Sequence, residues 1–160
     1  MPTRFLNEQC RLRGTSHSEH GRGVRVVPRK SEEEVVFYHL DCDAFRDEYH
    51  LREKPVCDLL VFYGVRRAPP IDRFVELKGA EGYGHAVAQI EGALGALKND
   101  LSDCQRGVRF RALVVGAGSS PPNKPLLVKR LSKKGVSLEF KTGWQKGTYD
   151  IRPHLESRLP

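Results

Sequence analysis

Two apolar stretches on either side of a short proline-containing segment constrain the fold of this chain most strongly. Residues 56–63 (VCDLLVFY) and 72–78 (DRFVELK) are rich in β-branched and aromatic side chains, a composition that favours β-strands. Residues 64–70 (GVRRAPP) between them contain two adjacent prolines, which do not continue a strand and favour a turn. The pattern therefore predicts an antiparallel hairpin.

The register of this hairpin decides which charged side chains meet. If it closes around position 67, Asp58 stands opposite Glu76 at the open end. Cross-strand neighbours have Cβ atoms about 4.5–5.5 Å apart, so we expect the two carboxyl groups to lie close together. Lys78 is two residues beyond Glu76 and shares its face, because side chains alternate along a strand. Two acids and a lysine are thus expected at the end of two apolar strands.

Adjacent carboxylates repel each other unless a cation or a proton lies between them. Mg²⁺ or Mn²⁺ suits such a pair, since both ions take oxygen ligands and Mg²⁺ is often held by one or two carboxylates and a substrate phosphate. A metal ion there would polarise a phosphate and activate a water that the lysine orients. The cluster therefore indicates metal-dependent phosphodiester hydrolysis. A Glu-x-Lys sequence also ends many ordinary strands, and an aspartate can simply cap a strand. The hypothesis of a catalytic site therefore depends on the hairpin register that places Asp58 opposite Glu76.

The elements around the hairpin predict one mixed sheet. Residues 34–40 and 108–115 are expected to be strands, before and after the hairpin. Residues 85–98 carry Val87, Ile90 and other apolar side chains at helical spacing. An antiparallel run of strands followed by a helix that crosses to another strand is an α/β arrangement.

The other segments give weaker signals. Residues 1–31 are polar and glycine-containing, and we expect an irregular basic segment with at most a short strand at 24–27, ahead of a single domain at 32–160. The remaining expectations are loops at 41–54 and 116–125, a strand or helix start at 126–131, and a last strand at 137–141.

The ordered set CDLLVFYG (57–64), FVELKGA (74–80) and HAVAQIEGAL (85–94) resembles the PD-(D/E)xK nuclease superfamily. The resemblance covers about residues 35–118. It implies a restriction-endonuclease-like fold, in which helices flank a mixed β-sheet. It is similar in particular to small members that combine an ELKG sequence with a following helix that carries a glutamine.

The resemblance also implies roles for individual residues. Asp58 and Glu76 match the two metal carboxylates, and Lys78 matches the catalytic lysine. The backbone carbonyl of Leu77 would be a further metal ligand, and Gln89 matches the glutamine that faces the site from the following helix.

The sequence departs from the family pattern in two places. Cys57 stands where the family name has proline. Many members have a glutamate on an N-terminal helix, whereas here no helix is expected before the first strand. The nearest candidate is Glu34, with Glu32 and Glu33 beside it, and the alternative is that all three are solvated side chains. The reserve metal ligands are Asp41 and Asp43.

Charge is distributed unevenly. The net charge is +7, made up of +5 in residues 1–30, −4 in 31–120 and +6 in 121–160. An acidic centre with basic ends suits a protein that holds a cation and grips a polyanion, although many small proteins are simply basic. A C-terminal basic cluster either follows a phosphate backbone or forms a solvated edge; it consists of Lys129, Arg130, Lys133 and Lys134.

The cysteines and histidines predict no further site. The four cysteines include no Cys-x-x-Cys pair, which favours reduced thiols and a cytoplasmic protein. His39, Cys42 and Cys57 match no zinc spacing, and His17 and His20 lie in the irregular segment, so none is expected to bind metal. No apolar run approaches the roughly 20 residues of a membrane helix.

The sequence thus predicts a Mg²⁺- or Mn²⁺-dependent nuclease, an enzyme that hydrolyses DNA or, alternatively, RNA. Its expected partner is nucleic acid, DNA ahead of RNA, with a homodimer or a larger complex left open and no membrane. Two other functions stay open: a nucleic-acid-binding module that does not cleave, and a partner-dependent subunit of a defence or repair complex.

Overall fold

A computed structural model describes residues 8–29, 32–66, 71–78, 82–104 and 109–156. Its centre is a five-stranded sheet in the order β3-β4-β5-β6-β7. The first three strands are antiparallel, and the last two join parallel to β5. The mixed sheet predicted from the sequence is therefore confirmed; its strands are β3 (Glu33–His39), β4 (Leu59–Val65), β5 (Ile71–Lys78), β6 (Arg109–Gly116) and β7 (Ser137–Lys141).

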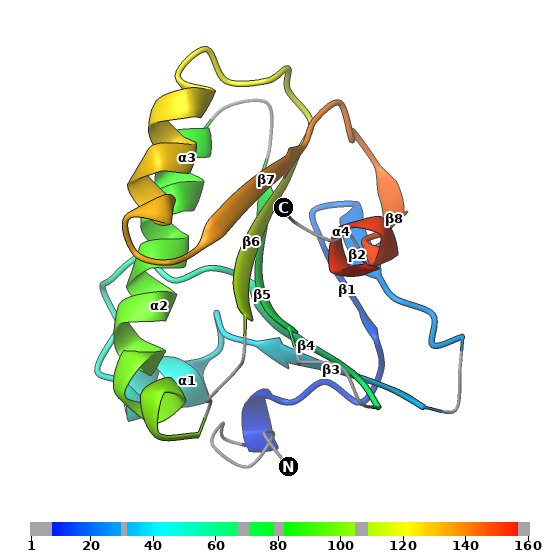
Figure 1. Ribbon diagram of the computed structural model, residues 1–160, viewed down its shortest axis with the longest axis vertical. Helices are drawn as coiled ribbons and strands as arrows, with labels where there is room; N and C mark the ends of the chain where they lie inside the picture. The colour runs from blue at the N-terminus through cyan, green and yellow to red at the C-terminus, as the bar shows by residue number, and fades with distance from the viewer. Residues whose placement is uncertain (1–7, 30–31, 67–70, 79–81, 105–108, 157–160) are drawn as a thin grey trace.

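Helices cover one face of this sheet (Figure 1). The long helix α2 (Tyr83–Cys104) crosses from β5 to β6, and α3 (Lys124–Ser132) crosses from β6 to β7. The shorter α1 (Asp43–Glu48) lies in the connection between β3 and β4. A large apolar core fills the space between helices and sheet, because Ile90 and Leu97 of α2 meet the alternate sheet residues that face them.

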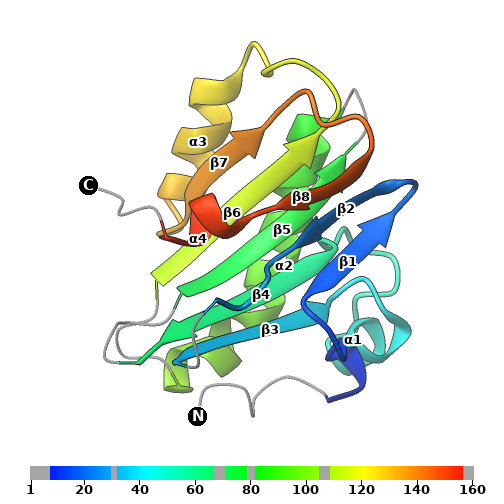
Figure 2. The same ribbon diagram turned by 90° about the vertical axis from the view of Figure 1, so that its right-hand side faces the viewer.

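A second, smaller sheet covers the other face, as Figure 2 shows. It consists of β1 (Ser16–Glu19), β2 (Arg22–Arg25) and β8 (Gly147–Asp150), with α4 (Arg152–Glu156) directly after β8. Strands β2 and β8 are parallel, so residues 22–25, from the first part of the chain, lie beside residues 147–150, from its last part. A second apolar core lies between this layer and the five-stranded sheet.

Several segments differ from what the sequence predicted. Residues 16–23, expected to be irregular, lie in the β1–β2 hairpin, and a short 3₁₀ helix, η2 (Glu8–Cys10), precedes it. Strand β2 overlaps the short strand expected at 24–27 in two residues. Residues 41–54, expected to be a loop, contain α1. The choice left open for residues 126–131 resolves to a helix, because α3 spans them and buries Leu127 and Leu131 on one side. Within the described ranges, no helix has the length and apolarity that a membrane span requires.

The predicted hairpin register is confirmed. In the β4–β5 ladder Leu59 pairs with Val75, and each further pair keeps the same alignment up to Tyr63 and Ile71. One step toward the open end, this alignment places Asp58 opposite Glu76. The turn predicted at 64–70 lies in part outside the described residues, which end at Arg66 and resume at Ile71.

Candidate functional site

The two predicted carboxylates lie together where β4 begins and β5 ends. Asp58 is 4% exposed and Glu76 is 1% exposed. The backbone N–H of Asp58 donates a hydrogen bond to Oε2 of Glu76 at 3.0 Å. Glu76 pairs with Val114 of β6, whose side chain belongs to the core beneath the helices, so the carboxylates belong to the helix-covered face.

The backbone of Asp58 is held from both neighbouring strands. Its carbonyl oxygen accepts a hydrogen bond from the N–H of Leu40 at 2.9 Å, which continues the β3–β4 pairing one residue beyond His39 and Leu59. On the other side its N–H donates a hydrogen bond to the Glu76 carboxylate. The position of Asp58 is therefore fixed by the sheet itself, as a preorganised site requires.

Helix α2 packs closely on the segment that leads into β4. The side-chain amide of Gln89 donates to the carbonyl oxygen of Val56 at 3.3 Å. Its other polar atom, Oε1, is buried and has no hydrogen-bond partner among the described residues. One turn later, a Cβ added to Gly92 would lie 2.0 Å from the carbonyl oxygen of Pro55. A glycine at 92 thus allows the helix to contact the backbone directly.

The two carboxylates act on the neighbouring thiol. Burial, followed by the negative charges of Glu76 and Asp58, raises the pKa of the Cys57 thiol well above its ordinary value. Cys57 is therefore a neutral side chain, and its Sγ–H donates weakly to the carbonyl oxygen of Leu59 at 3.7 Å. It supports the strand start and supplies no anionic ligand.

Two other predicted site residues are placed by their backbones. Leu77 pairs with Val115 and Lys78 with Gly116 at the end of the β5–β6 ladder. Their side chains lie outside the described part of the structure. The structure therefore brings together Asp58 and Glu76, and it places Gln89 against Val56, two residues before Asp58.

The candidate upstream glutamates do not reach this site. Glu33 pairs with Val65 and Glu34 with Gly64, at the opposite end of β3 from Asp58. The Glu33 side chain is 2% exposed and accepts a hydrogen bond from Arg152 at 3.0 Å. Glu33 therefore holds α4 against the sheet and is not a metal ligand at the carboxylate pair.

The reserve ligands directly follow the end of β3 that lies beside Asp58, where α1 begins. Arg46 donates a hydrogen bond from Nε to Oδ1 of Asp41 at 2.7 Å, and it donates another to the carbonyl oxygen of Leu51. Asp43 begins α1 and is exposed. Asp41 is thus engaged in fixing the loop after α1.

The predicted basic cluster lies on α3 and just beyond it. All four of its side chains, Lys129, Arg130, Lys133 and Lys134, are exposed. Arg130 forms an ion pair with Glu91, in which Nε donates to Oε1 at 2.9 Å and joins α3 to α2. The three lysines form no ion pair in the described part of the chain, so they are the members available to a phosphate backbone.

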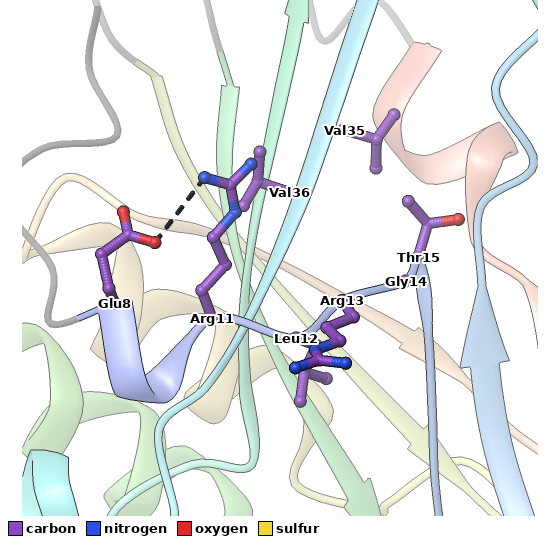
Figure 3. Close-up of a pocket in the computed structure, with 8 residues that line it drawn as sticks. All are labelled: Glu8, Arg11, Leu12, Arg13, Gly14, Thr15, Val35 and Val36. Carbon is purple, nitrogen blue, oxygen red and sulfur yellow. Dashed lines mark ion pairs between the residues drawn. The ribbon is translucent and has the colours of Figure 1, made fainter.

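A pocket of about 450 Å³ lies away from the carboxylates, between residues 8–15 and the edge strand β3 (Figure 3). Arg11 and Glu8 form an ion pair at its rim, at 3.8 Å. Leu12 donates its N–H to the carbonyl oxygen of Phe37, so the pocket forms where this segment crosses the sheet edge. It contains none of the predicted site residues.

One cluster of potential metal ligands was missed by sequence reasoning. His17 and Glu19 of β1 meet His39 of β3, and their ligand atoms all lie within 4.8 Å of one another. The signal available in the sequence was His-x-Glu, which puts both side chains on one face of a strand. The third member could not be found this way, because it comes from a different sheet.

Comparison of this chain with protein-family models, with curated proteins and with solved structures finds no match. Any function must therefore be argued from the chain's own residues. The carboxylate pair is the strongest basis for that argument, because it combines burial, a shared hydrogen bond and a backbone fixed on both sides.

Proposed function

We propose that this protein is a metal-dependent nuclease of the PD-(D/E)xK superfamily, with a restriction-endonuclease-like fold, that hydrolyses phosphodiester bonds of DNA or RNA. The observation that carries the proposal is the juxtaposition of Asp58 and Glu76 in the predicted hairpin register, joined by a hydrogen bond of 3.0 Å. The strand order supports the same family: three antiparallel strands, a crossing helix and a parallel strand.

The residues present fit Mg²⁺ or Mn²⁺. Both ions prefer oxygen ligands, and the pair supplies carboxylate oxygens from two adjacent strands. The buried Oε1 of Gln89 is a further oxygen atom on the helix-covered face, without a hydrogen-bond partner in the described structure. Asp58, Glu76 and the carbonyl of Leu77 would hold the ion. When bound, such an ion polarises a phosphate and lowers the pKa of a water.

The chain's own residues then divide the remaining tasks. The sheet fixes Asp58 through hydrogen bonds on both sides, which keeps its carboxylate in place during turnover. Gln89 anchors the segment before Asp58 through Val56. Lys78 would orient the attacking water and stabilise charge on the phosphate. The exposed Lys129, Lys133 and Lys134 would contact the nucleic-acid backbone.

A second candidate is a nucleic-acid-binding module that does not cleave. The observation in its favour is the near-complete burial of both acids, with one oxygen of Glu76 already accepting a backbone hydrogen bond. Such a pair could serve only to secure the start of β4. A binding module would keep its affinity without a divalent cation and in the absence of Lys78.

The deciding experiment is a cleavage assay on plasmid, linear duplex DNA, single-stranded DNA and RNA, with Mg²⁺, Mn²⁺ or EDTA. Glu76→Gln and Lys78→Ala are compared with the surface controls Glu53→Gln and Lys146→Ala, and circular dichroism checks the fold of each variant. The proposal predicts metal-dependent cleavage that the two site variants lose by at least about 100-fold, as removal of a group that stabilises a transition state does, and the controls retain. Salt-sensitive binding without cleavage would support the binding module instead.

A further inference from the structure

A second cluster lies on the opposite face of the five-stranded sheet, between it and the small sheet. Along β1 the exposed residues alternate with His17 and Glu19, which are partly buried. His17 pairs with Val24 of β2, whose side chain is fully buried in the core between the sheets. His17 and Glu19 therefore face the five-stranded sheet.

The third member comes from that sheet. His39 is the last residue of β3 and pairs with Leu59, which is buried in the same core between the sheets. Asp58 and Glu76 belong to the other face, so the two clusters are separated by the sheet although His39 and Asp58 are near neighbours in the ladder.

The distances in this cluster are close to those of a metal coordination sphere. Glu19 Oε1 lies 3.1 Å from His17 Nε2 and 3.5 Å from His39 Nε2. Two ligand atoms of tetrahedral Zn²⁺, each about 2.0–2.1 Å from the ion, are about 3.3–3.4 Å apart. The two histidine nitrogens lie within 4.8 Å of each other, a gap that small side-chain rotations would close.

An ordinary histidine–glutamate hydrogen bond explains only part of this arrangement. His17 and Glu19 are within hydrogen-bonding distance. Nε2 of His39 is buried and lies 3.5 Å from the same carboxylate oxygen, which is longer than a normal hydrogen bond, so this contact is weak. The two rings are only 4.7 Å apart between centroids, so protonating both would place two cations side by side. One shared cation would satisfy all three groups.

We propose that His17, Glu19 and His39 bind Zn²⁺, with the fourth position left to water or an external ligand. Two imidazoles and one carboxylate are a ligand set that zinc takes in proteins, whereas Mg²⁺ prefers oxygen alone. The side chains are 13%, 31% and 27% exposed, in chain order from His17 to His39, so an ion can enter from solvent. The ion would tie the β1–β2 hairpin to β3.

The test is calorimetric titration of metal-stripped full-length protein with ZnCl₂, and separately with MgCl₂. Removing a group that merely orients a metal ligand costs roughly 10–100-fold in affinity, so removing a ligand should cost at least that much. In Glu76→Gln, in which the other proposed metal site lacks a carboxylate, we expect one Zn²⁺ per chain that excess MgCl₂ does not displace. We also expect a raised melting temperature, and loss of affinity of that size in His39→Ala and Glu19→Gln. Cobalt substitution should give the intense visible absorption of a four-coordinate site.

The matched control is His20→Asn, which removes a neighbouring histidine and keeps a residue that tolerates the positive φ of 50° at this position. Zinc affinity should be unchanged in this variant and in Glu76→Gln, which tests the nuclease site separately. If His39→Ala does not fold, the zinc affinity of the conservative Glu19→Gln variant tests the proposal. Absence of zinc binding, or equal binding in Glu19→Gln and the unmodified protein, would overturn the proposal.

Discussion

Gly92 of α2 lies so close to the carbonyl oxygen of Pro55 that a Cβ at position 92 would be 2.0 Å from that oxygen. The obstructing atom belongs to the backbone, so it cannot move aside as a flexible side chain would. This contact brings α2 onto the segment that enters β4 and, with the hydrogen bond from Gln89 to Val56, holds the residues that lead into Asp58.

The first prediction is that alanine has opposite effects at the two glycines of α2. Gly92→Ala should lower the free energy of unfolding by about 1–3 kcal/mol, as overpacking does. Gly95→Ala should raise it by up to about 1 kcal/mol, because a Cβ there meets nothing within 4 Å and alanine favours the helix. Urea denaturation of both variants measures the difference. Equal stabilisation by both would show that α2 does not contact Pro55.

The second prediction concerns acid stability. Hydrogen bonds from the backbone N–H of Arg29 and from the side chains of Arg152 and Tyr63 lower the pKa of Glu33 from 4.5 to about 2. Because the folded pKa is the lower one, this stabilisation is complete above about pH 4.5 and is lost as the pH falls toward 2. Stability measured against pH should therefore decline across that window.

Glu33→Gln should flatten this decline and should also destabilise the protein at neutral pH. Breaking a buried ion pair costs about 3–5 kcal/mol, and the lower end applies here since Arg152 keeps its ion pair with Glu156. The exposed neighbour Glu32 provides the control: Glu32→Gln should leave the pH profile as it is. An unchanged slope in Glu33→Gln would contradict the assignment.

The third prediction separates positioning from stability at Gln89. Gln89→Met keeps the volume of the side chain and removes both the donor to Val56 and the buried Oε1. Loss of one such hydrogen bond costs about 1 kcal/mol of stability. If Gln89 also positions the proposed metal site, the proposed cleavage activity should fall at least about tenfold in the folded variant, the effect expected of groups that orient metal ligands. A stability loss with unchanged cleavage would confine Gln89 to a structural role.

The fourth prediction concerns the thiols. The Sγ atoms of Cys10 and Cys42 lie 3.1 Å apart, and burial, followed by Cys42, raises the pKa of Cys10 to about 12. Diamide, a thiol oxidant, should convert this pair to a disulfide with loss of two hydrogen atoms, visible by intact mass and peptide mapping. Cys42→Ser should abolish the crosslink, whereas Cys57→Ser should not. A crosslink that includes Cys57 would contradict the structure.

The part of the fold that was predictable is the part with local signals. The β4–β5 register followed from a short proline-containing turn and from alternation in two apolar strands, and it placed Asp58 opposite Glu76. The helix after β5 followed from its apolar spacing, although α2 begins at Tyr83, ahead of the expected start. In each case the prediction depended only on residues that are close together in the sequence.

What could not be predicted depends on distant partners. Strands β1, β2 and β8 have four residues each and contain few apolar side chains, so their sequences look like loops. Strand β2 finds its parallel partner more than a hundred residues later in the chain. His39 meets His17 only once the two sheets are stacked, and no spacing rule joins residues across such a contact.

The parallel pairing of β2 with β8 also determines the order in which the protein can mature during translation. Strand β2 leaves the ribosome long before β8, so β2 has no strand partner on that side while the strands of the large sheet are synthesised. Until Ile151 and Leu155 leave the exit tunnel, part of the apolar face that includes Phe37 and Leu113 lacks its cover. The nascent chain thus exposes part of this apolar surface until the segment that contains α4, which Arg152 ties to the carbonyl oxygen of Val27, covers it.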